Sequence, residues 1–268
     1  MNKSYKSIYA ESFATVLRQQ HAGIGSAKAA LRRFLKSVDT VGWSRREESG
    51  RIDRRALTRF ATGDANIFSR REVAECETSA VSILVDLSES TDNIVSYDSI
   101  AKRCSVFRDI AVHLAKLISD VGCNVAVNGF HGSKKRDNIG LQESVTFVEL
   151  KGFGESITAA APAIASIPAL VGGATPEFNS IKIAIEQVAA RPEHRKVLFI
   201  LTDADDFNLE AVKHLDEVAK KLGVVLVAIG CGTASIEQCF TNCARVTTAS
   251  ELFTSSFTKL LHSLKEAA

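Results

Sequence analysis

Several features that would place a chain in a membrane or a secretory pathway are missing from this sequence. No stretch approaches the roughly 18 consecutive apolar residues that a membrane-spanning helix needs. The first residues, Met-Asn-Lys-Ser-Tyr-Lys, contain no apolar run of the kind found in secretory signals. The sequence also has no internal repeat and no low-complexity tract. We therefore expect a folded protein that resides in the cytoplasm.

Motifs for several kinds of chemistry are missing as well. The six cysteines include no Cys-x-x-Cys pair. The spacing of Cys231, Cys239 and Cys243 is only weak evidence for zinc, because no histidine lies within the spacing of structural zinc sites. We expect these thiols to be free and buried. None of the six histidines lies near a serine or cysteine in a pattern typical of a nucleophile and its base. The sequence therefore predicts no catalytic residue and no organic cofactor.

What remains is the composition of a globular protein with uneven charge. Of the 268 residues, 46% are apolar and 24% are charged, which is enough for one large core and a small accessory element. Residues 1–79 carry 15 Lys or Arg and 9 Asp or Glu, a net charge of +6, whereas residues 80–268 carry 18 and 22, a net charge of −4. The two parts could attract each other or different partners.

Helical periodicity dominates residues 1–79. Two apolar stripes predict helices, one from Tyr5 to Leu17 and one from Leu31 to Val38. A short third helix is expected from Asp53, as its N-cap, to Gly63, with residues 44–51 as a solvated connection. We predict that residues 1–79 form a basic helical N-terminal extension.

From residue 80 onwards, short β-branched runs alternate with amphipathic helices. Runs this apolar are typical of strands that are buried on both faces. Strands are expected at Val81–Asp86, Asn124–Phe130, Val145–Leu150, Val197–Thr202 and Val224–Ile229. Because such alternation produces right-handed crossovers, the predicted fold is α/β. We expect residues 80–268 to form a mostly parallel sheet with helices on both faces.

Three polar loops map to one edge of this sheet. The first reads Asp86-Leu87-Ser88-Glu89-Ser90, the second Gly172-Gly173-Ala174-Thr175-Pro176, and the third Thr202-Asp203-Ala204-Asp205-Asp206. Sheets of this kind bind ligands at the carboxyl ends of their strands, and carboxylate and hydroxyl oxygens suit an octahedral Mg²⁺. We predict a metal site formed by Asp86, Ser88, Ser90, Thr175 and Asp203.

These residues also have a plainer interpretation. Asp and Ser commonly form turns and helix N-caps between a strand and a helix, so Asp86, Ser88 and Ser90 could do only that. Asp205 and Asp206 could be solvated turn residues or N-caps of a helix that begins near Leu209. We keep Asp205, Asp206 and Glu89 as groups that could lie just outside the ligand set.

Taken in order, the five predicted ligands resemble the metal-ion-dependent adhesion site (MIDAS) of the von Willebrand factor A (vWA) family. That site uses Asp-x-Ser-x-Ser, a later Thr, and an Asp in a Thr-Asp-Gly-like turn. The resemblance covers residues 80–265 and implies a vWA or Rossmann-like fold with a bound divalent cation, Mg²⁺ or alternatively Mn²⁺ or Ca²⁺. Two positions depart from the family, since Glu89 and Ala204 stand where glycine is common. Glu89 could strengthen cation binding or occupy the position of a partner's carboxylate.

Within this family the chain is most similar to the C-terminal part of the cobaltochelatase subunit CobT and its relatives. The similar residues are Gly50-Arg51-Ile52-Asp53-Arg54-Arg55-Ala56-Leu57 and Phe68-Ser69-Arg70-Arg71, directly before the first metal-loop strand. The long acidic stretch that usually precedes the vWA domain of CobT proteins is missing. The resemblance implies a partner AAA+ ATPase of the CobS or MoxR type, and this chain has no P-loop of its own.

We therefore expect a metal-dependent protein-interaction subunit without catalysis of its own. Two alternatives stay open. One is a subunit of an ATP-dependent cobalt or magnesium chelatase complex acting in cobalamin or other tetrapyrrole biosynthesis, and the other is a metal-free structural module.

Two basic segments could also suggest a partner. His131-Gly132-Ser133-Lys134-Lys135-Arg136 is expected to be a solvated turn, with contact to an anion as the alternative. The arginines between residues 45 and 71 have no interleaved aromatic residues for base stacking, so they do not favour nucleic acid. We expect them to face an acidic ATPase surface or the acidic part of this chain.

Overall fold

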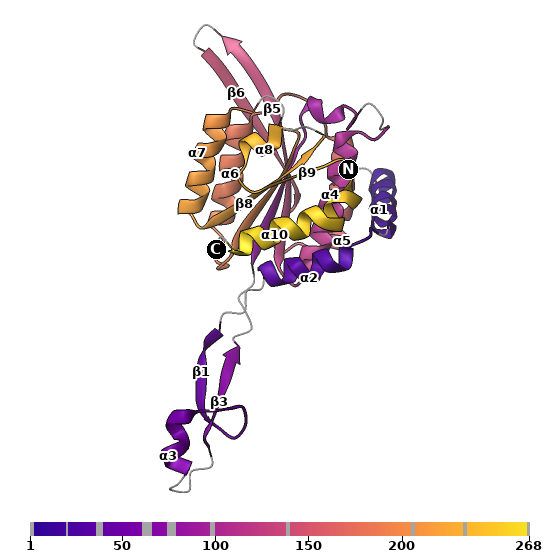
Figure 1. Cartoon of the computed structure of the whole chain (residues 1–268). Helices are drawn as coiled ribbons and strands as arrows, with labels where there is room; N and C mark the ends of the chain where they lie inside the picture. The colour runs from indigo at the N-terminus through magenta and orange to yellow at the C-terminus, as the bar shows by residue number, and fades with distance from the viewer. Residues whose placement is uncertain are drawn as a thin grey trace. The chain divides into compact units, whose positions relative to one another are not determined.

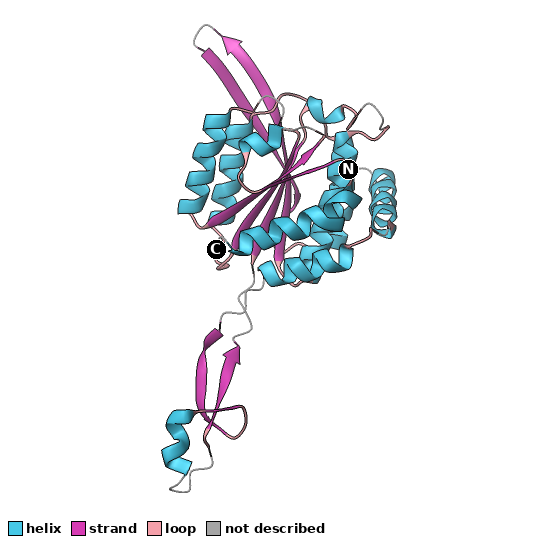
Figure 2. Cartoon of the chain, in the orientation of Figure 1, coloured by secondary structure: helices cyan, strands magenta, loops and turns pink. Residues whose placement is uncertain are grey.

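The structure is a computed structural model, and it separates into two units (Figures 1 and 2). It describes residues 3–19, 21–35, 40–60, 66–73, 79–96, 100–137, 140–204, 207–232 and 235–266. The larger unit combines Met1–Leu35 with Thr78–Ala268, and the smaller unit is Lys36–Glu77. The division therefore differs from the predicted boundary after residue 79, because the first two helices fold with the sheet.

The N-terminal helices are α1 (Lys3–Arg18), close to its predicted bounds, and α2 (Ile24–Leu35), which begins well before the predicted Leu31. Phe13 on α1 and Leu31 on α2 are buried in the same core that covers one face of the central sheet. This burial explains why the helices belong to the larger unit. Val38, the last residue of the second predicted stripe, lies outside the described residues.

The C-terminal end of α2 accepts hydrogen bonds from two side chains elsewhere in the larger unit. The Ser79 hydroxyl donates a hydrogen bond to the Leu35 carbonyl oxygen, and the Arg195 guanidinium donates to the Phe34 carbonyl oxygen. The guanidinium also lies over the Phe34 ring, 5.1 Å from its centroid. Carbonyls in the last turn of a helix have no partner within the helix, so these contacts satisfy two of them.

The smaller unit contains a three-stranded antiparallel sheet, with strand order β1-β3-β2. Its strands are β1 (Thr40–Glu47), β2 (Arg51–Ile52) and β3 (Phe68–Val73). The prediction of a connection over residues 44–51 was therefore wrong at its ends, since β1 continues to Glu47 and β2 begins at Arg51. The short helix is confirmed as η1 (Arg54–Ala56) and α3 (Leu57–Phe60), because the Asp53 carboxylate accepts a hydrogen bond from the Arg55 N–H. Gly63 lies outside the described residues.

The central sheet of the larger unit has six strands in the order β6-β5-β4-β7-β8-β9. Only the pairing of β5 with β6 is antiparallel, so the predicted mostly parallel sheet is confirmed. The order reverses between β4 and β7, which are neighbours although the chain visits β5 and β6 between them. The strands are β4 (Ala80–Asp86), β5 (Asn124–Asp137), β6 (Gly140–Lys151), β7 (Lys196–Thr202), β8 (Val224–Cys231) and β9 (Cys243–Val246).

Strands β5 and β6 form a long hairpin that continues past the ends of the other strands (Figure 1). The predicted basic turn at residues 131–136 was wrong, because β5 continues through it to Asp137. Its backbone is paired with β6 along the whole segment, from His131 opposite Thr146 to Arg136 opposite Leu141. Polar side chains suggested a turn, but the pairing of two antiparallel strands rests on backbone hydrogen bonds, which do not depend on an apolar pattern.

Helices cover both faces of the sheet, as predicted (Figure 1). Alternate residues of β4 explain how: Val81, Ile83 and Val85 belong to the core under α1, α2, α4, α5 and α10, and Leu84 belongs to the core under α6 and α7. The remaining helical elements are α4 (Arg103–Asp120), α5 (Ile157–Ala165), η3 (Ile167–Ala169), α6 (Glu177–Ala189), α7 (Leu209–Lys221), α8 (Ser235–Cys239), α9 (Ala249–Glu251), the π-helical η4 (Leu252–Ser256) and α10 (Phe257–Glu266).

Two further expectations concern membranes and thiols. Among the described residues, every helix is too short or too polar to cross a bilayer. The described cysteines are free thiols, buried at Cys104, Cys123, Cys231 and Cys239 and half-buried at Cys243, as predicted. Burial raises the pKa of the Cys231 thiol to about 12, so it stays protonated and behaves as a small apolar group.

Candidate metal site

The candidate site lies at the carboxyl ends of β4 and β7, where the strand order reverses. Asp86 ends β4, Asp203 follows β7, and the loop before α6 reaches the same edge. Two backbone hydrogen bonds join the first and second loops: the Glu89 N–H donates to the Gly173 carbonyl at 3.0 Å, and the Gly172 N–H donates to the Leu87 carbonyl at 2.8 Å. The structure thus brings the three predicted loops together at one edge.

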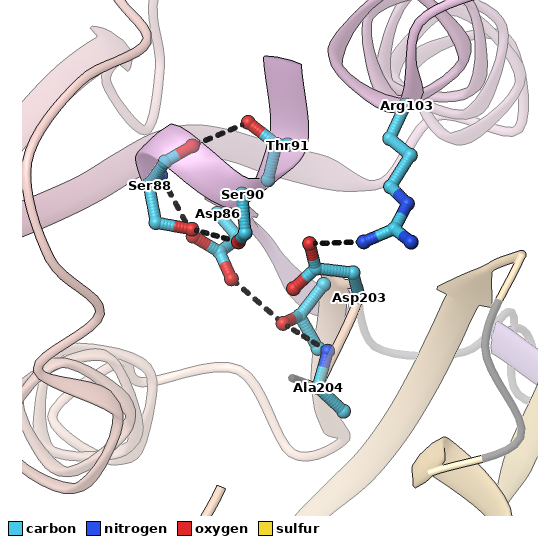
Figure 3. Close-up of polar contacts among 8 residues, drawn as sticks. Asp86, Ser88, Ser90, Thr91, Arg103, Asp203 and Ala204 are labelled. Carbon is cyan, nitrogen blue, oxygen red and sulfur yellow. Dashed lines mark hydrogen bonds and ion pairs between the residues drawn. The ribbon is translucent and has the colours of Figure 1, made fainter. Parts of the chain in front are cut away.

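Asp86 is fully buried, and both of its carboxylate oxygens are fixed. Oδ1 accepts a hydrogen bond from the Ser88 N–H at 2.9 Å (Figure 3). Oδ2 accepts one from the Thr202 hydroxyl at 2.7 Å. The Thr202 hydroxyl in turn accepts a bond from the Ala204 N–H at 3.0 Å. Thr202 therefore couples the first loop to the third, a role that sequence reasoning missed although Thr precedes Asp in the family motif.

Ser88 and Ser90 present their hydroxyls to each other, with the two Oγ atoms 3.0 Å apart (Figure 3). They lie at the start of η2 (Glu89–Asp92), and the Ser88 side chain makes no capping hydrogen bond to that helix. The Thr91 hydroxyl donates to the Ser88 carbonyl at 2.7 Å and holds the turn. Helix capping therefore does not explain the position of the Ser88 hydroxyl. The hydrogen bond from the Ser88 N–H to Asp86, by contrast, is an ordinary turn contact.

Thr175 is half-buried in the loop before α6, and its backbone position is set by β5. Ala174 and Gly132 exchange two backbone hydrogen bonds, of 2.7 and 2.9 Å. Gly173 has φ of +79°, and a Cβ atom there would lie 2.5 Å from the Gly132 carbonyl oxygen. Only glycine fits this position without strain, so the hairpin strand and the second loop can approach closely.

Asp203 is also fully buried, and it forms an ion pair that the sequence did not predict. Its Oδ2 accepts a hydrogen bond from Nη1 of Arg103 at 2.8 Å, and the Arg103 side chain is only 13% exposed (Figure 3). Arg103 is the first residue of α4 and lies 100 positions away in sequence. Nothing in the sequence distinguishes it from the other basic residues, so no local signal could have found it.

The Asp86 and Asp203 carboxylates are both buried away from water, and this burial determines the electrostatics of the site. The pKa of Asp86 is raised to about 7, first by burial and then by the negative charge of Asp203, while the hydrogen bonds from Ser88 and Thr202 oppose the rise. Two buried negative charges this close require a positive charge or a proton. The Arg103 guanidinium supplies one positive charge to the pair.

The two positions that depart from the family have different environments. Ala204 has φ of +52° and is the one described non-glycine residue with positive φ, a conformation that favours glycine. Glu89 is exposed at the start of η2. Asp205 and Asp206 lie outside the described residues.

The donor set is one of hard oxygens. In the described part of the chain, no group of three or more His, Cys, Asp and Glu side chains is placed to hold a metal. A cation at this edge would therefore depend on the Asp86 and Asp203 carboxylates together with serine and threonine hydroxyls. Oxygen ligands of this kind suit Mg²⁺, Mn²⁺ or Ca²⁺.

The chain is similar to known proteins in its structure. No protein-family model and no curated protein matches the chain. The PilB minor pilin from Streptococcus sanguinis is similar in structure, with a TM-score of 0.52 and 14% identity over 74% of this chain and 64% of the pilin. Proximal thread matrix protein 1 from the mussel byssus, in a structure with a zinc-occupied MIDAS motif, has a TM-score of 0.50 and 17% identity over 69% of this chain and 46% of that protein.

The fold is vWA-like. The chain spans less than two thirds of either similar structure. At these identities the likeness concerns the fold, and the predicted similarity to CobT is not shown. Asp86 ends β4, Ser88 and Ser90 lie in the turn that follows it, Thr175 precedes α6, and Asp203 follows β7.

Proposed function

We propose that this chain is a protein-interaction module that binds its partner through a divalent cation held at the carboxyl edge of the sheet. The observation that carries the proposal is the fully buried Asp86 carboxylate, fixed beside the paired hydroxyls of Ser88 and Ser90. Thr175 and Asp203 complete the proposed ligand set. A bound cation would offer an open coordination position to a carboxylate of the partner.

The surface beside the site supports a docking role. The loop that follows η2 exposes two isoleucines, Ile100 at 99% and Ile94 at 47%. The loop is closed at its base by a β-bridge between Ile94 and Lys102 and by an ion pair of 2.8 Å between Lys102 and Asp92. Large apolar side chains held at the surface in this way favour contact with another protein.

The finer parts of the proposal rest on the sequence. We propose Mg²⁺ as the cation, and the zinc-occupied MIDAS motif of the mussel protein supports a divalent ion without deciding which one. An AAA+ ATPase of the CobS or MoxR type is the proposed partner, and a cytoplasmic location goes with it. The chelatase alternative rests on the resemblance to CobT alone.

A second candidate function is favoured by one observation. The ion pair between Arg103 and Asp203 gives the site a positive charge of its own. In a metal-free structural module, the guanidinium would take the place of the cation and the hydroxyls would only order the loops.

Calorimetric titration of the whole chain with Mg²⁺ and with Mn²⁺ separates these two candidates. Wild type should bind one divalent ion, and Ser90→Ala and Asp86→Asn should weaken binding by about tenfold or more, because the first removes an oxygen ligand and the second removes the negative charge of the carboxylate. Asp92→Asn is the matched control, since it removes a carboxylate from the same loop but one that is 51% exposed and paired with Lys102. Absence of binding by folded wild type at millimolar concentrations would overturn the metal proposal and support the metal-free module.

The proposed partner needs its own experiment. The full chain should co-purify with a CobS- or MoxR-type ATPase in Mg²⁺ and lose it in EDTA, and Asp92→Asn should behave as wild type does. Co-purification that is unchanged by EDTA would refute a cation-dependent interface.

A further inference from the structure

Arg103 is held in place from two directions. Its guanidinium donates to Asp203 at 2.8 Å, and its backbone N–H donates to the Asn93 carbonyl at 3.0 Å. The side chain therefore enters the site from the start of α4, across the base of the loop that exposes Ile94 and Ile100. A long arginine side chain with 13% exposure and a fully buried partner is fixed at a definite point in the site.

The chemistry of the guanidinium opposes a divalent cation. A cation ligated by Asp86, Ser88 and Ser90 lies at the same group of buried carboxylates that the guanidinium already neutralises. Like charges repel strongly where water is excluded. The two positive groups would also draw on the same acceptor, because Asp203 Oδ2 is occupied by Arg103 Nη1.

We propose that Arg103 sets the cation affinity of this site by competing with the metal for Asp203. The inference rests on the proposed function, since it concerns the same ligand set. In the absence of a cation, the guanidinium keeps the edge of the sheet formed. When a cation binds, Arg103 leaves Asp203 or shares it, and the free energy of breaking this ion pair lowers the net affinity.

Replacing Arg103 with a neutral side chain should therefore have two measurable effects. Arg103→Gln should bind Mn²⁺ about tenfold or more tightly than wild type, because the removal of a neighbouring like charge changes an ionic equilibrium by at least that factor. The thermal stability of Arg103→Gln should also become cation-dependent, with a melting temperature that falls in EDTA and recovers in Mg²⁺. Wild type should change much less between the two conditions.

The same helix offers a matched control. Arg108 on α4 forms an ion pair with Asp109 at 2.8 Å, and its side chain is 22% exposed. Arg108→Gln removes the same charge from the same helix without touching the site, so its cation affinity should stay near that of wild type. In the double variant Arg103→Gln with Asp203→Asn, the gain in affinity should disappear because the contested carboxylate is gone.

A measurement on wild type covers the case in which Arg103→Gln fails to fold. The guanidinium N–H resonances of Arg103, followed by NMR, should shift when Mg²⁺ is added, and those of Arg108 should not. If wild type binds the cation while the Arg103 resonances stay unchanged, the competition is refuted, whether or not Arg103→Gln folds. If neither wild type nor Arg103→Gln binds any divalent ion, the proposed function itself fails.

Discussion

Two adjacent glycines in the second loop should respond in opposite ways to the same substitution. In Gly173→Ala the new Cβ would lie 2.5 Å from the Gly132 carbonyl oxygen, at a φ of +79°. In Gly172→Ala the Cβ would have no atom within 4 Å, and φ lies outside the left-handed region. The pair therefore tests whether the close approach of the second loop to β5 holds the site together.

The size of the effect follows from two contributions. A left-handed backbone costs an L residue roughly 1–2 kcal/mol, and relief of a steric overlap in a packed region costs about 1–3 kcal/mol. Reduced freedom of the unfolded chain offsets about 0.4–1 kcal/mol of this. We expect Gly173→Ala to lower the free energy of unfolding by about 2–3 kcal/mol, and Gly172→Ala to leave it unchanged or raise it by up to about 1 kcal/mol.

Urea unfolding and thermal melting of both variants measure this difference. For a chain of this size, about 2–3 kcal/mol corresponds to a fall in melting temperature of roughly 4–12 °C. The two variants share composition, loop and type of substitution, so general effects of adding a methyl group cancel. Equal stability of Gly173→Ala and Gly172→Ala would show that the two backbone hydrogen bonds between Gly132 and Ala174 do not fix the loop.

Two further predictions concern the buried polar groups. Thr202→Val keeps the shape of the side chain but removes the hydroxyl between Asp86 and Ala204, so it should lower the free energy of unfolding by about 1–3 kcal/mol, and a urea midpoint equal to that of wild type would contradict this. Burial lowers the pKa of His21, and His113 beside it, with ring centroids 4.5 Å apart, lowers it further. A histidine with a lowered folded-state pKa resists protonation, so stability should fall as pH drops below about 6.5. Unfolding of wild type and His21→Phe at pH 8 and pH 5.5 checks this, and an equal loss in both would exclude His21 as the cause.

The sequence predicted the central sheet well, because its strands are continuous apolar runs. Val81–Asp86 and Val197–Thr202 were placed to within one residue of β4 and β7. Strands with mixed polarity were missed. Residues 40–47 include Ser44, Arg45 and Arg46, so their strand is stabilised by pairing with β3 rather than by an apolar pattern. β9 was missed because it has only four residues, with one side chain exposed.

The candidate site was predictable as far as it is local in sequence. Asp86, Ser88 and Ser90 form a motif within five residues, and their strand-end position follows from the apolar run before them. The approach of Thr202 to Asp86 depends on which strands are neighbours, and the approach of Arg103 to Asp203 depends on where α4 begins relative to β7. Sequence periodicity carries neither kind of information, and the partner of a buried charge can come from anywhere in the chain.

The hydrogen bond from Ser79 to Leu35 has a consequence for the smaller unit. The chain leaves the larger unit after Leu35 and returns at Thr78, so its exit and re-entry points are adjacent. Lys36–Glu77 is thus an insertion at one position in the chain of the larger unit. The free energy of closing a loop changes by only about 0.6 kcal/mol for each doubling of its length. The inserted segment could therefore be lengthened, shortened or exchanged for another small domain with little change in the stability of the larger unit.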